Sequence, residues 1–129
     1  MRQKHFIDSH KALTGVFVLV LMFAYERWDS YTLWAYFGMH GCYGLLWILK
    51  SRIFGDSQWE QRCGIGYGLY IWAGLSLYWI TPWLIVTGNG LLYDPFEVPP
   101  WWLGSALFCF GLGVFCHFSA DMQKHTTLK

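Results

Sequence analysis

Charged residues are scarce in this sequence: Asp, Glu, Lys and Arg make up 13% of the 129 residues, about half the fraction found in ordinary soluble domains. Hydrophobic residues make up 55%, which argues against a soluble globular domain. The nine basic and eight acidic residues leave a net charge of +1, so the basic excess that binds nucleic-acid phosphates is missing. Nucleic acid is therefore not an expected partner.

The cysteines lack the spacing of a metal site or a disulfide framework. None stands in a C-x-x-C arrangement, and each lies in or beside an apolar run, so neither a zinc site nor a set of disulfides is indicated. We expect no metal centre and interpret the four side chains as small, buried hydrophobic groups. They are Cys42, Cys63, Cys109 and Cys116.

What the sequence has in abundance is apolar and aromatic residues, the latter 21% of the chain and including nine tryptophans. A helix needs about 20 apolar residues to cross the hydrocarbon core of a bilayer. The first apolar run is short, and extending it to Phe6 would require Asp8, His10 and Lys11 to lie at the membrane interface. The sequence predicts one all-α transmembrane domain, a bundle of four helices with spans at about 12–25, 31–49, 63–86 and 101–118.

The distribution of basic residues predicts the orientation of the four spans. Of the nine Lys and Arg residues, Arg27 alone falls in a connection on the other side of the membrane from the two termini. Because basic residues gather on the cytoplasmic side, both termini are expected there. Tryptophans follow the predicted boundaries and suggest an aromatic belt, with Trp28, Trp34, Trp83, Trp101 and Trp102 near the outer interface and Trp47 and Trp59 near the inner one.

Small residues and one proline give further detail within the spans. Glycines remove side-chain bulk where helix backbones approach each other, so we expect tight packing at these positions. Pro82 lacks the backbone N–H of a helical hydrogen bond and is expected to kink the third helix or to end it early. The glycines are Gly38, Gly41, Gly44, Gly64 and Gly68, and a turn is predicted at Thr87-Gly88-Asn89-Gly90.

His40 lies at the middle of the second run, where an ionisable residue normally faces the interior of a bundle. Tyr43 follows three residues later, on the same helical face. The two are candidate catalytic residues, because a tyrosine hydroxyl and an imidazole are suitable acids for a carbonyl oxygen that gains charge. The same pair also fits a purely structural role, in which a neutral histidine joins helices by hydrogen bonds. His117 lies too far along its helix to share a haem with His40.

Two sequence stretches resemble a known superfamily. HGCYGLLWILK at residues 40–50, continuing as SRIFGD, is similar to the second-helix signature of bacterial membrane proteins in the steroid 5-alpha-reductase and isoprenylcysteine methyltransferase superfamily. SADMQK at residues 119–124 resembles its short cofactor-side motif, Asp or Asn followed by x-Gln-Lys. Gly55 departs from the pattern, which has proline there. The resemblance covers the N-terminal half of such proteins, whose second half carries an Arg-Asn-Pro-Asn-Tyr type segment.

The resemblance implies a site for NADPH or S-adenosylmethionine at the cytoplasmic end of the fourth helix. Gln123 and Lys124 would contact amide or phosphate groups of the cofactor, and Asp121 would orient the segment. It also implies a hydrophobic lipid substrate and a location in the bacterial inner membrane. A basic residue just after a membrane span is expected in any case, so Lys124 also has a simple topological explanation.

Two functions therefore stand side by side. In the first, the chain is the membrane-embedded half of a lipid-modifying enzyme, a reductase or a methyltransferase, that needs a partner polypeptide or a second half for activity. In the second, it is a non-catalytic subunit of a larger respiratory, photosynthetic or oxygenase complex, packed through its glycine faces. A transporter or channel fits less well, because no predicted span carries a charged residue in its interior.

Overall fold

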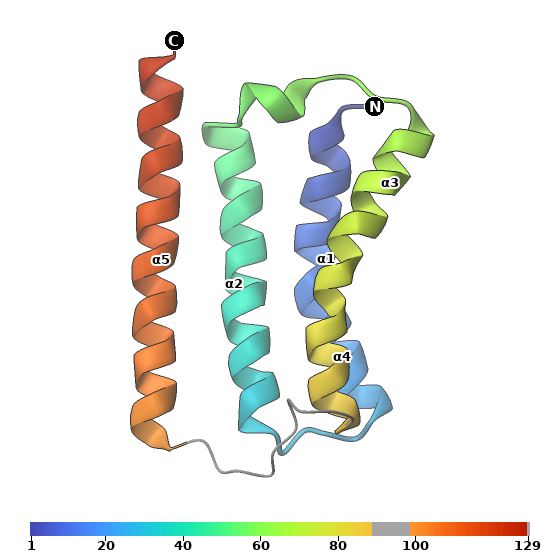
Figure 1. The fold of residues 1–129 in the computed structure, drawn as a ribbon, viewed down its shortest axis with the longest axis vertical. Helices are drawn as coiled ribbons and strands as arrows, with labels where there is room; N and C mark the ends of the chain where they lie inside the picture. Colours follow the sequence, from blue (N-terminus) through green and yellow to red (C-terminus); the bar gives the residue numbers. More distant parts are fainter. Residues whose placement is uncertain (89–98, 129) are drawn as a thin grey trace.

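The computed structural model describes residues 1–88 and 99–128, and helix accounts for 85% of the chain, with no strand among the described residues. The helices run nearly parallel or antiparallel to one another (Figure 1). In chain order they are α1 (Gln3–Ala24), α2 (Tyr31–Ile53), the 3₁₀ helix η1 (Ser57–Glu60), α3 (Ile65–Ser76), the 3₁₀ helix η2 (Leu77–Trp79), α4 (Ile80–Thr87) and α5 (Pro100–Thr127).

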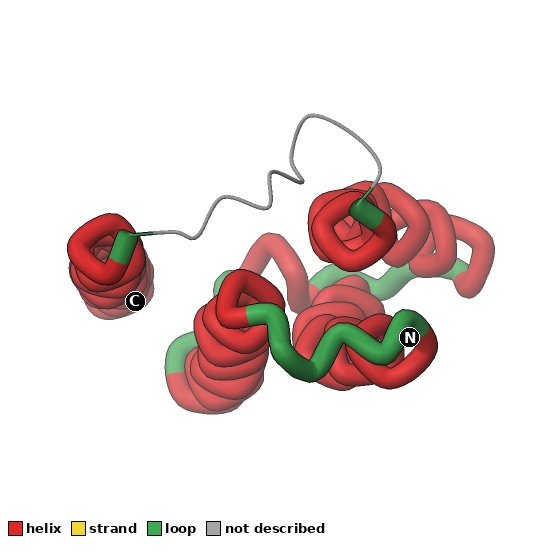
Figure 2. Tube along the Cα trace, turned by 90° about the horizontal axis from the view of Figure 1, so that it is seen from below, coloured by secondary structure: helices red, strands yellow, loops and turns green. Residues whose placement is uncertain are grey.

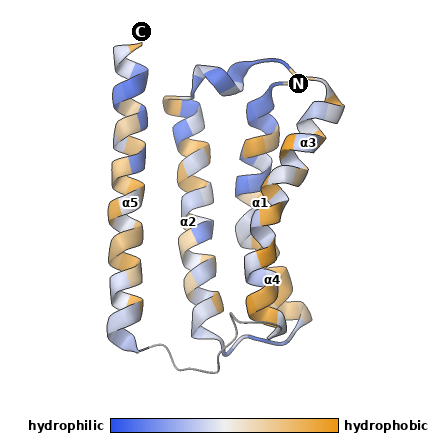
Figure 3. Cartoon of the chain, in the orientation of Figure 1, coloured by the Kyte–Doolittle hydropathy of each residue, from blue (hydrophilic) through white to orange (hydrophobic). Residues whose placement is uncertain are grey.

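Helices α1 and α2 form the most extensive contact in the bundle, α3 packs on α1, and α4 packs on both α1 and α2. Helix α5 stands at the edge of the molecule beside α2 (Figures 1 and 2). Both termini and η1 lie at the same end of the helices (Figure 1). We call this the charged end, because hydrophilic residues gather there (Figure 3).

Three segments are long and apolar enough to cross a membrane: α1, the stretch Ile65–Thr87 and α5. The prediction of a helical membrane protein is therefore supported by the fold. Helix α2 has 23 residues, which is sufficient length, but its tyrosines, its glycines and His40 lower its hydropathy, and it is not among the three. The membrane span at 31–49, which falls on α2, therefore stays a prediction.

The expected start of the first helix was wrong. Helix α1 begins at Gln3, so Asp8, His10 and Lys11 lie within it rather than before it. Asp8 accepts hydrogen bonds from Trp47 Nε1 at 3.1 Å and from Ser51 Oγ at 3.0 Å, both on α2. Because α2 supplies hydrogen-bond donors for Asp8, the helix extends well beyond its apolar run.

The third predicted span is interrupted as its proline suggested. A 3₁₀ turn, η2, separates α3 from α4, and Pro82 lies in the first turn of α4, where the missing N–H leaves the carbonyl of Tyr78 without a helical partner. Helix α4 ends at Gly88, whose φ of 65° is the left-handed conformation typical of a helix C-cap. The remainder of the predicted turn and the loop carrying Asp94 and Glu97 lie outside the described residues.

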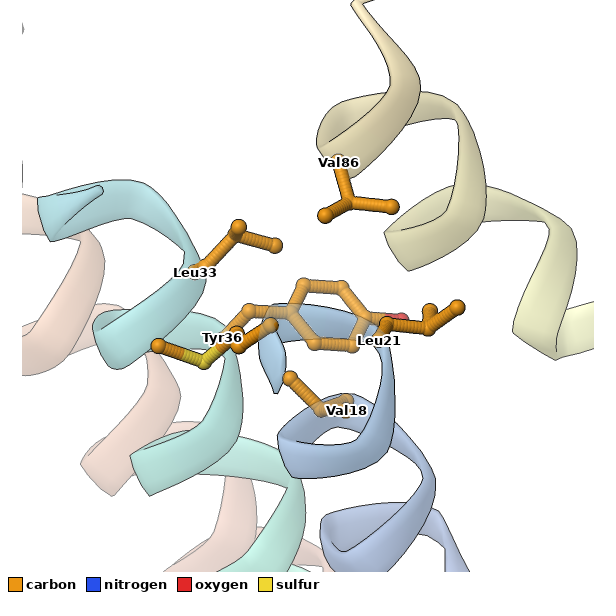
Figure 4. Close-up of a cluster of buried hydrophobic side chains, with 6 residues drawn as sticks. Val18, Leu21, Leu33, Tyr36 and Val86 are labelled. Atoms are coloured by element: carbon orange, nitrogen blue, oxygen red, sulfur yellow. The ribbon is translucent and has the colours of Figure 1, made fainter. Parts of the chain in front are cut away.

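The apolar core lies where α1, α2 and α4 meet (Figure 4). The end of α1, the start of α2 and the end of α4, which supply it, lie opposite the charged end (Figure 1). The members of the core come from all three helices: Val18, Leu21, Met22, Leu33, Tyr36 and Val86. The expectation of buried cysteines was wrong for three of the four residues. Cys42, Cys109 and Cys116 are exposed, the last two because α5 buries none of its residues, and Cys63 is half-buried.

Three of the glycines predicted to pack tightly do so. A Cβ atom on Gly44 would overlap the carbonyl oxygen of Lys11, and one on Gly68 would overlap the ring of Phe6. Gly41 meets Gly15 of α1 through its backbone. A Cβ atom added to Gly38 or Gly64 would have no neighbour within 4 Å, so the prediction fails for these two.

Candidate functional site

Ion pairs join α5 to α2 and to the connection that follows it. Lys50 Nζ lies 2.7 Å from Asp121 Oδ2, and the Lys50 side chain is only 5% exposed. One turn further along α5, Lys124 Nζ lies 2.8 Å from Asp56 Oδ2. His117 Nε2 also approaches Asp121, at 3.6 Å. Asp121 and Lys124, two of the three predicted cofactor-binding residues, thus attach α5 to α2 and to the connection after it.

A pocket of about 300 Å³ opens beside these pairs, at the lower end of the usual range for small-molecule sites. Asp121 and Lys124 both contribute to it, whereas Gln123 is exposed on α5 and does not line it. The structure therefore brings together two of the three residues that the motif singled out. The lining is Lys50, Phe54, Gly55, Asp56, Ser57, Glu60, Asp121, Lys124, His125 and Leu128.

Two acidic residues of this pocket, Asp56 and Glu60, have lowered pKa values. The pKa of Asp56 is lowered, first by the hydrogen bond from Lys124 and then by a hydrogen bond from the Gln58 backbone N–H. The pKa of Glu60 is lowered chiefly by its hydrogen bond from Lys4 and also by Arg2. Each carboxylate is matched by a base, so Lys124 can turn toward an anionic ligand only by leaving Asp56.

The N-terminal segment fixes the wall of the pocket that η1 forms. Arg2 and Lys4 donate to the two oxygens of Glu60. Backbone hydrogen bonds from Gln3 N to Gln61 O, at 3.0 Å, and from Cys63 N to Met1 O, at 2.9 Å, attach the start of α1 to the chain after η1. Segments that are far apart in sequence, at separations of 58 residues for Arg2–Glu60 and 56 for Lys4–Glu60, are thus joined at this end of the bundle.

His40 and Tyr43, the candidate catalytic pair, have different partners in the structure. The Tyr78 hydroxyl lies 2.8 Å from His40 Nδ1, and the Tyr36 ring packs against the imidazole with a centroid separation of 4.0 Å. Tyr43 instead stacks on Phe118 of α5, at 5.9 Å. The hydroxyl beside His40 is therefore that of Tyr78.

Sequence reasoning missed Tyr78. It belongs to η2 and is 38 residues from His40, so no helical spacing connects them. Tyr78 is 46% exposed, so the residue is only partly covered by the rest of the bundle. The only sequence signal was a polar side chain near Pro82, where the regular helix was expected to be interrupted.

Lys11 is the second residue that sequence reasoning misplaced. Its ammonium group lies over three aromatic rings, at 5.2 Å from the centroid of Tyr43, 5.7 Å from Trp47 and 5.6 Å from Tyr78. A lysine expected at the interface thus faces α2 and η2 inside the bundle. The rings of Tyr43 and Tyr78 therefore both contact the ammonium group of Lys11.

His10 adds a buried imidazole to the same side of α1. It is 1% exposed, it stacks on Trp79 at 4.7 Å and it meets the edge of Trp72 at 5.2 Å. Within the described part of the chain neither ring nitrogen has a hydrogen-bond partner. Trp79 donates to Thr14 Oγ1 at 3.0 Å, so this cluster joins α1 to the η2 segment.

In residues 1–88 and 99–128, no group of three or more His, Cys, Asp or Glu residues is arranged to hold a metal ion. No family model, curated protein or solved structure matches this chain. The resemblance to the steroid 5-alpha-reductase and isoprenylcysteine methyltransferase superfamily therefore stays a prediction from two short motifs.

Proposed function

We propose that this chain is the membrane-embedded half of a lipid-modifying enzyme, and that the pocket at the charged end takes part of a polar cofactor. The observation that carries the proposal is the convergence of Asp121 and Lys124, from the Asp-x-Gln-Lys motif, with Lys50 and Asp56 around a pocket of about 300 Å³. A pocket of that volume takes a phosphate, a nucleobase or an amino-acid group, which are parts of NADPH or S-adenosylmethionine.

The proposed topology has four spans with the charged end in the cytoplasm, as in a bacterial inner membrane. It is supported by the position of both termini and η1 at one end of the helices (Figure 1). The bases of that end include Arg2, Lys4, Lys50 and Lys124, as the positive-inside rule requires. Helix α2 lies between α1 and α5 and runs alongside both of them (Figure 1). This position favours α2 as a membrane span in addition to α1, α3–α4 and α5. Exposed Trp28, Trp34, Trp83, Trp101 and Trp102 would then anchor the outer interface.

In this proposal the pocket binds the cofactor, and the Tyr78–His40 pair contacts the lipid substrate. Lys124 leaves Asp56 to bind an anionic or amide group of the cofactor, while Lys50 and Asp121 keep α5 in place. Tyr78, hydrogen-bonded to His40, donates its proton toward a lipid oxygen that gains negative charge. His40 precedes Lys50 by about 15 Å along α2, so the bound cofactor must extend from the pocket toward the pair.

Two reaction types fit this arrangement. If the cofactor were NADPH, it would supply a hydride for a carbon–carbon double bond conjugated to a carbonyl group, and the role of Tyr78 would be to protonate or hydrogen-bond the carbonyl oxygen. With S-adenosylmethionine, the activated methyl group passes to a lipid carboxylate or amine, and the chain contributes mainly positioning. Both need a lipid whose reacting group lies within the bundle.

The second candidate function is that of a non-catalytic subunit in a larger membrane complex. It is favoured by α5, whose most apolar stretch is 0% buried and therefore leaves a whole helix surface for other helices to cover. The enzyme proposal shares this feature, because it also requires a partner polypeptide or a second half to complete the site. The two differ in whether the assembly binds a cofactor.

Cofactor binding by the assembly purified from its native membrane tests the proposal. We expect NADPH or S-adenosylmethionine to bind, and Lys124→Ala to weaken binding about tenfold, as expected for the loss of one charge-assisted contact. Asp56→Asn removes the same ion pair but frees Lys124, so binding should be retained or become tighter. If neither cofactor binds, the non-catalytic function replaces the enzyme; if both variants bind like the wild type, Lys124 is not a cofactor contact.

A further inference from the structure

Lys11 occupies an unusual position for a lysine in an apolar helix. It lies eight residues after the start of α1, which is about 12 Å along the helix axis and directly before the first predicted span at 12–25. Its ammonium group is turned toward the rings of Tyr43, Trp47 and Tyr78. The side chain is half-buried, so a ligand can still reach it.

No carboxylate oxygen in the described part of the chain lies within 4 Å of the Lys11 ammonium group. Lys4, Lys50 and Lys124 each lie within 3 Å of a carboxylate oxygen, whereas Lys11 has no such partner among the described residues. The nearest acidic residue along α1, Asp8, directs its two carboxylate oxygens to Trp47 and Ser51 of α2 and forms no ion pair with Lys11. Lys11 therefore differs from the other lysines that face into the bundle.

Aromatic rings alone are a weak substitute for an anion. The attraction between a cation and a ring is small compared with the free energy needed to remove an ion from water. Charged residues within membranes normally face other charges, polar groups or a ligand pathway. The contacts around Lys11 therefore describe a positive site that still lacks its negative partner.

The neighbours of Lys11 indicate what that partner is. The ring of Tyr78 lies against the same cation, and when His40 Nδ1–H donates to the Tyr78 oxygen, the single hydroxyl proton of Tyr78 is free to be donated to a ligand. An ammonium and a hydroxyl together suit an oxyanion, and the apolar helix around them suits a hydrocarbon chain. A soluble anion without a hydrocarbon chain could not make use of the apolar helix surface beside Lys11.

We propose that Lys11 binds the oxyanion head group of an amphiphile, a carboxylate or phosphate on a hydrocarbon chain, and holds it beside Tyr78 and His40. The ring faces of Tyr43 and Trp47 keep the ammonium in place and limit its access to water. The inference rests on the proposed function in naming the substrate of the same site. Its test needs no cofactor, so it succeeds or fails separately.

The test uses a photoreactive palmitate with a diazirine in its chain, and the methyl ester of the same compound as a neutral match. The assembly is placed in phosphatidylcholine nanodiscs above neutral pH, and labelled peptides are mapped after irradiation. We expect saturable labelling of α1, α2 or η2 by the acid but not by the ester. Palmitate and phosphatidic acid should compete, and inorganic phosphate should not.

Variants separate the charge from the fold. Lys11→Met should reduce saturable labelling about tenfold, while Lys11→Arg, which keeps the cation, should label like the wild type. Lys4→Met removes a lysine that pairs with Glu60 and serves as the control. Equal labelling by acid and ester, or unchanged labelling of Lys11→Met, overturns the proposal. Displacement by inorganic phosphate also overturns it, because the site would then take a free anion.

Discussion

The ammonium group of Lys50 on α2 lies 2.7 Å from Oδ2 of Asp121 on α5, and it is almost completely shielded from solvent. The ring of Trp47 covers the same ammonium, at 4.6 Å from its centroid. Since α5 buries no residue of its own, this ion pair is a principal attachment of α5 to the rest of the bundle. The position of the pocket depends on it.

Removal of the carboxylate should therefore be costly. Asp121→Asn leaves Lys50 buried without a counter-charge, and we expect a loss of about 3–5 kcal/mol in stability. Lys50→Met should cost less, because Asp121 is 23% exposed and keeps His117 nearby. Unfolding in a mild detergent, followed by circular dichroism, measures both. Equal losses in the two variants would contradict this account of the pair.

A second prediction concerns the contact between α1 and α2. Gly44→Ala places a methyl group against the Lys11 carbonyl oxygen, so the helices must move apart, at a cost of about 1–3 kcal/mol. Gly38→Ala is the matched control on the same helix, because no atom lies within 4 Å of its new methyl group. It should be neutral or slightly stabilising. If thermal unfolding shows similar destabilisation in both, the close approach at Gly44 is not what packs these helices.

The sequence pattern predicts where helices form, but it does not predict which side chains meet when the helices pack. Apolar runs predicted the helices α2, α3–α4 and α5 to within a few residues at most ends. The Asp-x-Gln-Lys motif singled out Asp121 and Lys124, which line the pocket. The start of α1 was not predictable, because the partners of Asp8 and Lys11 lie on α2 and η2. Tyr78 was missed for the same reason, since its contact with His40 arises only when two separate helices pack together.

A third prediction separates the two tyrosines near Lys11. Tyr78→Phe keeps the ring over the lysine but removes the hydroxyl that meets His40, so activity of the assembly should fall by about 10²–10⁴-fold if this group is the acid. Tyr43→Phe keeps the stack on Phe118 and should change activity much less. Turnover of the native lipid substrate is the readout. A larger loss in Tyr43→Phe would return the role to the residue first suggested by the sequence.

A fourth prediction concerns acid sensitivity at the pocket. The pKa of Asp56 is lower in the folded chain than the value of about 3.9 for an unperturbed aspartate. The folded state therefore binds fewer protons, and the stabilisation is complete above about pH 4 and is lost as the pH falls through the folded-state pKa. The effect is small, because Lys124 is 53% exposed.

The difference in melting temperature between the wild type and Asp56→Asn isolates this contribution, because Glu60 and the other acids titrate in both proteins. The difference should be present near neutral pH and should vanish under strongly acidic conditions. A difference that is constant with pH, or that grows on acidification, would show that the Asp56–Lys124 pair does not stabilise the fold.

Label transfer tests the enzyme proposal most directly. The assembly purified from its native membrane is incubated with the native lipid extract and either NADPH tritiated at the transferable hydride or S-adenosylmethionine tritiated in its methyl group. We predict that tritium enters the lipid fraction from one of the two cofactors, and that Tyr78→Phe greatly slows the transfer if the donor is NADPH. Failure of an intact assembly to transfer label from either cofactor would contradict the proposal.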